Sequence, residues 1–544
     1  MQYPNIYSLF RSQCDKYGDD PIFFTRAGND WQSQSWNKVE EKVLDFACAL
    51  LTKGLTKGAS IAILAGNVPE WTICDIGAIA AGGVGVGIYP TSSAEQCAYI
   101  IDHSDAEFVI VDTEVQLNKV ATGFPKVNEI LCIENGSFKA FLELGRSNRN
   151  RFLPLVDDAG YSAKPDDIAI MVYTSGTTGQ PKGAMLSHKY ILNSVESLRL
   201  SVPIFDTDIS LSYLPGCHVA ERISGIYNRL YNGATAYFVD DLSKLYEDMV
   251  DVKPTVFASL PRFFEKIHAK VVSENGAGNI DAQTLKDAFG GSVRLLTSGG
   301  APLPLEIADF FAHHDLPILQ AYGLTENICV AFNTVDEHKF GTVGKPMPMC
   351  EVKIAADGEI LVKSEMMFSG YYKEPEKTAE MFDAEGWLKT GDLGELDKDG
   401  FLKITGRKKE IIVLSNGKNV APALVENYVK ESHLISHCYL FGDGKSYCVG
   451  LITLNEMEVA AYARASDIVF AETTGISQND RIRTAIAEIV ARANTRVSSS
   501  EQIKKFAILD HDFSASEDEI TPTMKLKRNV VARNYKNILE KLYE

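Results

Sequence analysis

The chain has 544 residues, of which 45% are apolar and 23% are charged, and its formal net charge at neutral pH is −18. This length allows several domains, and the composition is that of an ordinary globular protein with a sizeable core. The negative charge argues against nucleic acid as the main partner, because a phosphate backbone requires clustered lysine and arginine.

Cysteine usage and hydropathy bear on the compartment. The ten cysteines stand singly, without a Cys-x-x-Cys pair, and are too sparse for a disulfide framework. We therefore expect reduced thiols in a cytoplasmic protein. Residues 1–20 lack the apolar core of a signal peptide. The most membrane-like run, 76–89, is short for a span and rich in glycine, so we expect a buried helix that leads into a strand.

Helix and strand patterns alternate in the first part of the chain, which indicates an α/β architecture with largely parallel strand pairing. Ser92 and Glu95 predict a capping box at the start of one helix. The glycines within 82–87 follow a helix and do not fit Gly-x-Gly-x-x-Gly, so we expect close packing there. The other expected elements are a helix at 36–53, a strand at 61–64, a helix after Pro69 and strands at 84–88 and 108–111.

Residues 173–183 read Tyr-Thr-Ser-Gly-Thr-Thr-Gly-Gln-Pro-Lys-Gly, between an apolar run at 168–172 and a helical pattern that begins near His188. A strand, a small-residue loop and a helix are how backbone amides are gathered around phosphate. The pattern is not a Walker A loop, because Lys182 precedes a glycine rather than a hydroxyl residue. From composition alone, a flexible surface turn fits the loop equally well.

The second half of the chain continues the alternation and then changes texture. Between 340 and 406 short strands prevail, with hairpin turns expected at Asp357-Gly358 and Asp399-Gly400. We place a domain boundary near Lys409. The other expected elements are strands at 209–214, 235–239, 255–259, 293–297 and 447–453, helices around 478–495 and a final helix at 529–542.

Seven further stretches follow the loop in a fixed order, at 213–222, 298–303, 320–326, 387–394, 405–410, 415–422 and 520–528. Together with the loop, this ordered set closely resembles the AMP-forming acyl-CoA synthetase, luciferase and adenylation-domain superfamily. The resemblance runs from about residue 10 to the C-terminus. Gly-Lys-Asn-Val-Ala-Pro at 417–422 and Thr-Pro-Thr-Met-Lys-Leu-Lys-Arg at 521–528 look most like long-chain fatty-acid–CoA ligases.

The resemblance implies a multidomain α/β protein. Residues 1–407 would form a large adenylation domain of mixed and parallel sheets flanked by helices, with a β-rich subdomain at about 340–406. Residues 408–544 would form a small mobile α+β domain. The implied substrates are ATP, a medium- or long-chain fatty acid and coenzyme A, with Mg²⁺ as cofactor. Such an acyl substrate is compatible with peripheral contact at a membrane.

The same resemblance implies roles for individual residues. Tyr322 would stack on adenine, and Asp392 and Arg407 would bind the ribose. Glu326 would bind Mg²⁺, with Thr174 as a weaker second contact. The β- and γ-phosphates would be held by Thr174, Ser175, Gly176, Thr177, Thr178, Gly179 and Lys182. The nucleotide pocket would also include Gly299, Gly300, Ala301, Pro302 and Gly323.

Catalysis would depend on a second set. Lys525 would bridge the carboxylate and the α-phosphate, with Lys527 as its nearby competitor. His218 would lie beside the acyl carboxylate, and Thr325 would bind the α-phosphate. Lys409 matches the hinge position of the family. Gly417 belongs to the loop that lines the thiol channel after the C-terminal domain rotates.

Each role has a structural alternative. Tyr322 could be a core aromatic, Asp392 a turn cap and Glu326 a helix-start acid. The remaining alternatives are a solvated charge run for residues 407–409, a surface lysine for Lys525 and a structural histidine for His218. The pairs His313-His314 and His433/His437 lack a third ligand, so no zinc site is expected.

Several residues depart from the family pattern. Gly216, Cys217, Ala220 and Asn416 are unusual, and those near the acyl pocket leave the preferred chain length open. Two other functions also stay open. They are an acyl-AMP ligase that loads a carrier protein and a catalytically silent binding protein of the same fold.

Overall fold

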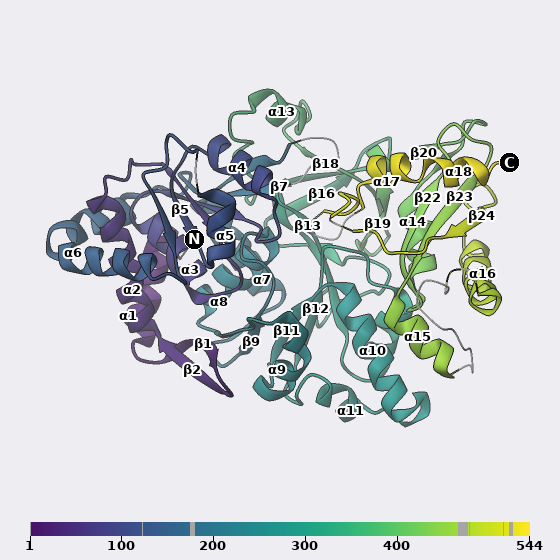
Figure 1. Ribbon diagram of the computed structural model, residues 1–544, viewed down its shortest axis with the longest axis horizontal. Helices are drawn as coiled ribbons and strands as arrows, with labels where there is room; N and C mark the ends of the chain where they lie inside the picture. Colours follow the sequence, from purple (N-terminus) through teal and green to yellow (C-terminus); the bar gives the residue numbers. More distant parts are fainter. Residues whose placement is uncertain are drawn as a thin grey trace.

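The computed structural model describes residues 2–121, 123–174, 180–465, 477, 479–514, 516–521 and 526–544. Figure 1 shows a large assembly of sheets and helices for the purple to teal part of the chain, with the green to yellow end as a smaller assembly on one side. The expected mixed α/β class is confirmed. Along the described part of the chain, every helix is too short or too polar to cross a membrane.

A six-stranded sheet occupies the first third of the chain, in the order β6–β5–β3–β4–β7–β8. Its strands are β3 (Ser60–Leu64), β4 (Val84–Ile88), β5 (Ala106–Val111), β6 (Glu129–Cys132), β7 (Ile168–Thr174) and β8 (Lys182–Ser187). The first five are parallel, and β8 returns antiparallel to β7. Parallel strands are buried on both faces, and all five residues of β3 are accordingly buried.

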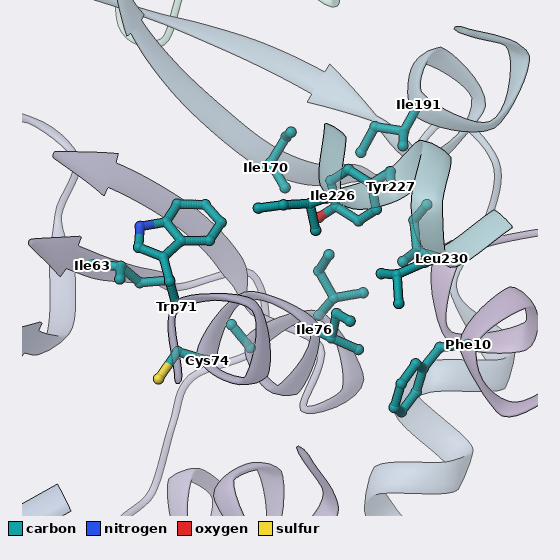
Figure 2. Packing of buried hydrophobic residues seen from close by; sticks show 14 of the residues in the cluster. Phe10, Ile63, Trp71, Cys74, Ile76, Ile170, Ile191, Ile226, Tyr227 and Leu230 are labelled. Atoms are coloured by element: carbon teal, nitrogen blue, oxygen red, sulfur yellow. The ribbon is translucent and has the colours of Figure 1, made fainter. Parts of the chain in front are cut away.

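Helices cover both faces of this sheet. Ile61 and Ile63 pack with one set, whereas Ala62 and Leu64 pack with the other. Figure 2 shows the first core, where Ile63 of β3, Ile170 of β7 and side chains of the covering helices gather. The first set includes α1 (Ile6–Tyr17), α2 (Trp36–Thr52), α3 (Pro69–Ala80), α6 (Ser137–Ser162) and α7 (His188–Ser201). The second is α4 (Ala94–His103) and α5 (Glu114–Val120).

The expected elements up to residue 111 are present, and one start signal is wrong by a residue. Ser93, not Ser92, caps α4: its hydroxyl accepts from the N–H of Gln96 at 3.2 Å. The Gln96 side chain accepts from the N–H of Ser93 at 3.0 Å, which completes the capping box. Gln96 takes the role expected of Glu95, because the helix begins one residue later.

His188, the first residue of α7, connects that helix to the N-terminus of the chain. Its Nδ1 accepts a hydrogen bond from the N–H of Ile6 at 3.2 Å, and its side chain is buried. Burial lowers the pKa of His188 to about 4. The unfolded chain, with a histidine pKa of about 6.5, therefore binds this proton more readily than the folded protein.

We expect the folded protein to lose about 3 kcal/mol of stability at this site as the pH falls from about 6.5 to about 4, and to retain it fully above that range. Denaturant unfolding at pH 7 and at pH 4.5 measures the difference. His188→Gln should be less stable at pH 7 but should show a smaller loss on acidification. His313→Gln, at an exposed position, is the matched control. Equal acid sensitivity in the wild type and His188→Gln would contradict the assignment.

Two further sheets follow. One has the order β2–β1–β10–β9, and the other has the order β11–β12–β13–β14–β15. The first contains β1 (Pro21–Ala27), β2 (Asp30–Ser35), β9 (Ile209–Ser212) and β10 (Thr235–Phe238). The second contains β11 (Val256–Ser259), β12 (Leu295–Ser298), β13 (Ile318–Leu324), β14 (Asn327–Phe332) and β15 (Lys345–Pro346).

The helical segments around these two sheets include a π-helix, η1 (Ala220–Tyr227), which directly follows the loop after β9. The others are α8 (Asn228–Asn232), η2 (Leu242–Lys244), α9 (Leu245–Val252), α10 (Pro261–Asn275), η3 (Ala277–Asn279), α11 (Ala282–Asp287) and α12 (Leu305–His313). The strands expected at 209–214, 235–239, 255–259 and 293–297 are all present within two residues of those limits.

The β-rich subdomain is an antiparallel meander, β16–β17–β18–β19, with α13 (Pro375–Glu380) inserted before β18. Both expected hairpin turns are confirmed: Asp357-Gly358 joins the first pair of strands and Asp399-Gly400 the last. The strands are β16 (Cys350–Ile354), β17 (Glu359–Ser364), β18 (Leu388–Leu396) and β19 (Leu402–Arg407).

The last part of the chain has its own cores, whose residues all lie beyond 411. After η4 (Lys408–Glu410) come β20 (Ile412–Val413), β21 (Asn419–Val420), α14 (Pro422–Lys430), β22 (Ile435–Phe441), β23 (Cys448–Leu454), α15 (Glu456–Ala465), α16 (Asp480–Thr495) and β24 (Ile503–Ile508). The expected single terminal helix is wrong. Tyr535 separates α17 (Arg528–Asn534) from α18 (Lys536–Lys541) with non-helical backbone, where its ring packs against Phe513.

Candidate active site

The predicted phosphate loop is a hairpin connection between two strands. Thr174 ends β7 and pairs with Lys182, the first residue of β8. The expected helix begins at His188, but only after the intervening strand. Gly183 allows that strand to pack closely, since a Cβ atom there would lie 2.7 Å from Met171 Sδ. The helix start is therefore separated from the loop by β8. Ser175, Gly176, Thr177, Thr178 and Gly179 lie outside the described residues.

Lys182 and Glu326 contact the same tyrosine, Tyr371. The Lys182 Nζ lies 4.7 Å from the centroid of the Tyr371 ring, and the Tyr371 hydroxyl donates to Glu326 Oε1. Glu326 is only 8% exposed. Burial, together with this carboxylate, raises the pKa of Tyr371, so the phenol stays protonated and can donate. Tyr371 thereby connects Lys182 to Glu326, which are 144 residues apart in the sequence.

Thr325 and Glu326 form the two-residue turn between β13 and β14, where Leu324 pairs with Asn327. The turn is held from outside. The Tyr190 hydroxyl donates to the Thr325 carbonyl at 2.9 Å, and the N–H of Phe368 donates to the Glu326 carbonyl at 2.8 Å. Glu326 is therefore not a helix-start acid, because it occupies a hairpin turn.

Gly323 permits the tight approach of the two strands in that hairpin. A Cβ atom at this position would lie 1.8 Å from the carbonyl oxygen of Ile328. A side chain there would push β13 away from β14 and displace the Thr325–Glu326 turn. The glycine is thus required by the backbone geometry of the site.

Tyr322, Asp392 and Arg407 form a second cluster, which shares strand β13 with the first. The Tyr322 hydroxyl donates to Asp392 Oδ2 at 2.6 Å. Arg407 Nε lies 3.0 Å from Asp392 Oδ1, across the paired strands β18 and β19. Asp392 is 4% exposed and lies within a strand, so it is not a turn cap. Burial, followed by the neighbouring carboxylate, raises the pKa of Tyr322 well above its ordinary value.

The loop 299–302 runs alongside β13. Gly300 has a φ of +77°, in the region that favours glycine, and a Cβ atom at Gly299 would lie 3.7 Å from the carbonyl oxygen of Ala321. The Gln320 side chain donates to the carbonyl of Ala301 at 3.5 Å. Gly299 and Ala301 therefore lie beside Gln320 and Ala321, the residues of β13 that directly precede Tyr322.

His218 lies at the start of the π-helix η1. Its Nδ1 accepts from the N–H of Ala220 at 3.2 Å, which places the proton of the neutral imidazole on Nε2. Its ring centroid is 6.5 Å from that of Tyr89, and its carbonyl accepts from the N–H of Arg222 at 2.9 Å. The imidazole is therefore oriented by Ala220, the first residue of the helix that follows it.

A fully buried ion pair fixes that helix to the six-stranded sheet. The Arg222 guanidinium contacts both carboxylate oxygens of Asp75 on α3 and donates to the carbonyl of Gly85 at 3.1 Å. The Tyr227 hydroxyl also donates to Asp75, at 2.7 Å. A Cβ atom at Gly85 would lie 2.2 Å from Asp75 Oδ1, so close packing explains this glycine of β4. Asp75 and Tyr371 support the site but lie outside all the motifs that predict it.

The remaining predicted residues belong to the last part of the chain. Lys409 is exposed in the short helix η4, directly after Arg407. Gly417 has a φ of +78° and lies in the turn between β20 and β21. Lys525 lies outside the described residues. The contacts that form the two clusters include neither Lys409 nor Gly417.

The donor set fits a magnesium ion shared with a substrate. Within the described ranges, no group of three His, Cys, Asp or Glu side chains could hold a metal by itself. Glu326 is a buried carboxylate that contacts Tyr371, and Thr174, the strand partner of Lys182, adds a hydroxyl at the end of β7. Mg²⁺ is commonly held by one or two carboxylates together with substrate phosphates, so these residues suit it.

Comparisons with known proteins cover nearly the whole chain. The family model described as AMP-binding enzyme matches residues 10–372, and that of the AMP-binding enzyme C-terminal domain matches residues 409–544. The long-chain-fatty-acid–CoA ligase FadD15 of Mycobacterium tuberculosis is 34% identical, over 96% of this chain and 95% of its own. The human long-chain-fatty-acid–CoA ligase ACSBG2 is 32% identical, over 99% of this chain and 92% of its own.

Two solved structures share the fold. ATP-bound MatB from Rhodopseudomonas palustris has a TM-score of 0.75 at 22% identity, covering 98% of this chain and 100% of its own. The A-PCP didomain of the carboxylic acid reductase from Segniliparus rugosus, in complex with AMP, has a TM-score of 0.80 at 23% identity. That match covers 100% of this chain and 82% of the didomain.

Proposed function

The chain belongs to the AMP-binding enzyme family, and from this membership we propose that it joins a fatty acid to coenzyme A while converting ATP to AMP and pyrophosphate. The observation that carries the proposal is that two clusters share the β13–β14 hairpin, which supplies Tyr322 to one and Glu326 to the other. Lys182 offers a positive charge to a phosphate, and Glu326 offers a negative charge to a metal ion bound to that phosphate. Tyr322 offers a ring and Asp392 a carboxylate to a nucleoside. Relatives named long-chain-fatty-acid–CoA ligases support the acyl substrate.

Each cluster has a defined part in the proposed reaction. Lys182 binds the β- and γ-phosphates, together with the loop that follows Thr174. Thr325 hydrogen-bonds the α-phosphate. Tyr322 stacks on adenine above the loop 299–302, and Asp392 accepts the ribose hydroxyls, with Arg407 beside it. When bound, Mg²⁺ would add positive charge between Glu326 and the phosphate oxygens, with Thr174 as a second contact.

The chemistry proceeds in two steps. A carboxylate oxygen of the fatty acid forms a bond to the α-phosphorus, and the bond from that phosphorus to the bridging oxygen breaks to release pyrophosphate. Both reactants are anions, so the first step needs positive charge and an in-line orientation, which we assign to Lys182, Lys525 and His218. The thiol sulfur of coenzyme A then bonds to the acyl carbon and loses its proton, and AMP leaves.

We propose that the chain works as two domains, residues 1–407 and 408–544, with Lys409 as the hinge. The separate cores beyond residue 411 support this division. Rotation about the hinge would withdraw Lys525 after adenylation and bring the loop containing Gly417 to the thiol channel. A few backbone dihedrals are enough to absorb such a motion.

The proposed function is tested with purified protein, ATP, Mg²⁺ and a panel of fatty acids, with and without coenzyme A. We expect AMP release and acyl-CoA formation for medium or long chains. Pyrophosphate release with accumulation of acyl-AMP but no acyl-CoA would instead indicate a carrier protein as the acceptor. A protein that releases no pyrophosphate in response to any fatty acid would contradict the proposal and indicate a binding protein.

Removing the charge of Asp392 should weaken ATP binding. We expect Asp392→Asn to raise the KM for ATP about 10- to 100-fold, because hydrogen bonds to a charged group contribute about 1.5–3 kcal/mol. Fatty-acid-dependent pyrophosphate release at varied ATP measures the effect. Tyr322→Phe keeps the ring and removes only the hydroxyl that donates to Asp392. The KM for ATP should therefore rise less in this variant. If Asp392→Asn lowers the melting temperature but leaves the KM for ATP unchanged, Asp392 is a structural residue.

A further inference from the structure

A groove of about 200 Å³ lies between the loop after β9 and the start of α10. Its walls are mainly apolar and are formed by Leu214, Leu260, Phe263 and the ring of Tyr213. The tyrosine is fixed in place, since its hydroxyl donates to the carbonyl of Ala258 at 2.8 Å. The groove is therefore a formed slot suited to a narrow, partly apolar chain.

The inner end of the groove lies between two loops of the proposed site. Tyr213 and Leu214 precede His218 by only a few residues in the same loop. On the other wall, a Cβ atom at Gly300 would lie 3.3 Å from Leu260 Cδ2. A nucleophile that enters along the groove would thus arrive between the loop of His218 and the nucleotide loop 299–302.

The base of the slot offers the hydroxyl of Ser259, and Ser298 lies behind it on the neighbouring strand, outside the lining. Ser259 lines the slot, and its hydroxyl donates to the Tyr213 hydroxyl oxygen at 2.7 Å, because the single phenol proton is used at the Ala258 carbonyl. Ser298 pairs with Ser259 in the parallel sheet, so the two side chains point to the same face. The Ser298 hydroxyl is buried, with 2% of the residue exposed, and has no hydrogen-bond partner within the described residues. The Ser259 hydroxyl, which does line the groove, can exchange hydrogen bonds with a ligand that carries amide groups.

Two cations stand at the mouth. Arg262 and Lys266 are four residues apart on α10 and therefore share one helix face. In the described ranges, Lys266 forms no ion pair. Arg262 lies 3.7 Å from Glu265 and donates to the carbonyl of Ile435 on β22, at 3.2 Å. Arg262 therefore joins the edge of the groove to the last part of the chain.

We infer that Arg262 and Lys266 bind the phosphate groups of coenzyme A, and that Arg262 exchanges the Ile435 carbonyl for a phosphate when it does so. The apolar walls and the Ser259 hydroxyl match the methylene and amide groups of the pantetheine arm, and the two cations match the phosphates. Binding of the acceptor and this docking of residues 408–544 would then exclude each other. The inference rests on the proposed function and extends it to the residues that recognise the acceptor.

The test compares coenzyme A with pantetheine, which has the same thiol arm but no phosphate. We expect Arg262→Gln and Lys266→Gln each to raise the KM for coenzyme A about tenfold, since a solvent-facing, charge-assisted contact is worth roughly that factor. The KM for pantetheine should stay within about twofold of the wild-type value, as should the rate of fatty-acid-dependent pyrophosphate release. Lys270→Gln, one turn further along α10 and paired with Glu274, is the matched control.

The possible results distinguish failure of the coenzyme A inference from failure of the proposed function. An unchanged KM for coenzyme A in both variants would overturn the inference, as would an equal rise for the two thiols or a rise in the KM for the fatty acid. Should Arg262→Gln fail to fold, the exposed Lys266 decides alone. A wild-type protein that acylates neither thiol would instead overturn the proposed function.

Discussion

Replacing Lys525 by alanine is expected to slow acyl-AMP formation about a thousandfold, the scale of losing one group that stabilises a transition state electrostatically. The fatty-acid carboxylate and the α-phosphate are both anionic, and charge builds between them as the new P–O bond forms. A lysine that touches both oxygens lowers this barrier without affecting a step in which no phosphate is attacked. Thioester formation from supplied acyl-AMP should therefore persist in Lys525→Ala.

The neighbouring Lys527 provides the matched control. Its Nζ forms an ion pair with Asp518, so its charge is already engaged in the folded protein. Lys527→Ala should retain acyl-AMP formation within about a factor of three, because exposed ion pairs contribute little. Pyrophosphate release measures the first step, and the acyl-CoA yield from synthetic acyl-AMP measures the second. A large loss in Lys527→Ala with normal activity in Lys525→Ala would reverse the assignment of the catalytic lysine.

The opposite pattern is expected from Lys409→Pro. Proline fixes φ near −65°, and Lys409 lies in the one-turn helix η4, between the last strand of the large assembly and the first of the small one. If the chain must turn at this residue between the two steps, the variant should form acyl-AMP at a near-normal rate but slow thioester formation about a hundredfold or more.

The control for this variant is Lys409→Ala, which removes the same side chain and leaves the backbone free. Because Lys409 is exposed, neither change should alter the core, and thermal unfolding checks this. Separate rates for the two steps, as above, give the comparison. If Lys409→Ala loses as much thioester activity as Lys409→Pro, the side chain rather than the dihedral is responsible, and the hinge assignment fails.

Much of the fold could be predicted from local patterns. Helix α2 follows directly from its helical apolar periodicity, and strands β3 and β4 follow from short apolar runs. All three elements are buried as these patterns predict. Strand β8 was missed because its six residues stand between a glycine-rich loop and a helix cap, so only pairing with β7 makes them a strand. Tertiary contacts decided that segment.

The candidate site was predicted only as far as its motifs reach. Glu326, Tyr322 and Asp392 belong to recognisable stretches, and the fold brings them together. Tyr371, which contacts both Lys182 and Glu326, belongs to no such stretch. Its importance arises from the packing of the chain against β8, through the bridge between Ala184 and Tyr371. A contact of that kind has no local sequence signal.

The buried Arg222–Asp75 pair has a consequence for how this chain can change over time. Loss of one partner leaves an uncompensated charge in the interior, at a cost of about 3–5 kcal/mol, which is a large share of the stability of a typical domain. Simultaneous replacement of both by well-packed apolar residues can be close to neutral. The two positions should therefore be inherited as a unit: descendants of this sequence are expected to keep both residues or to lose both.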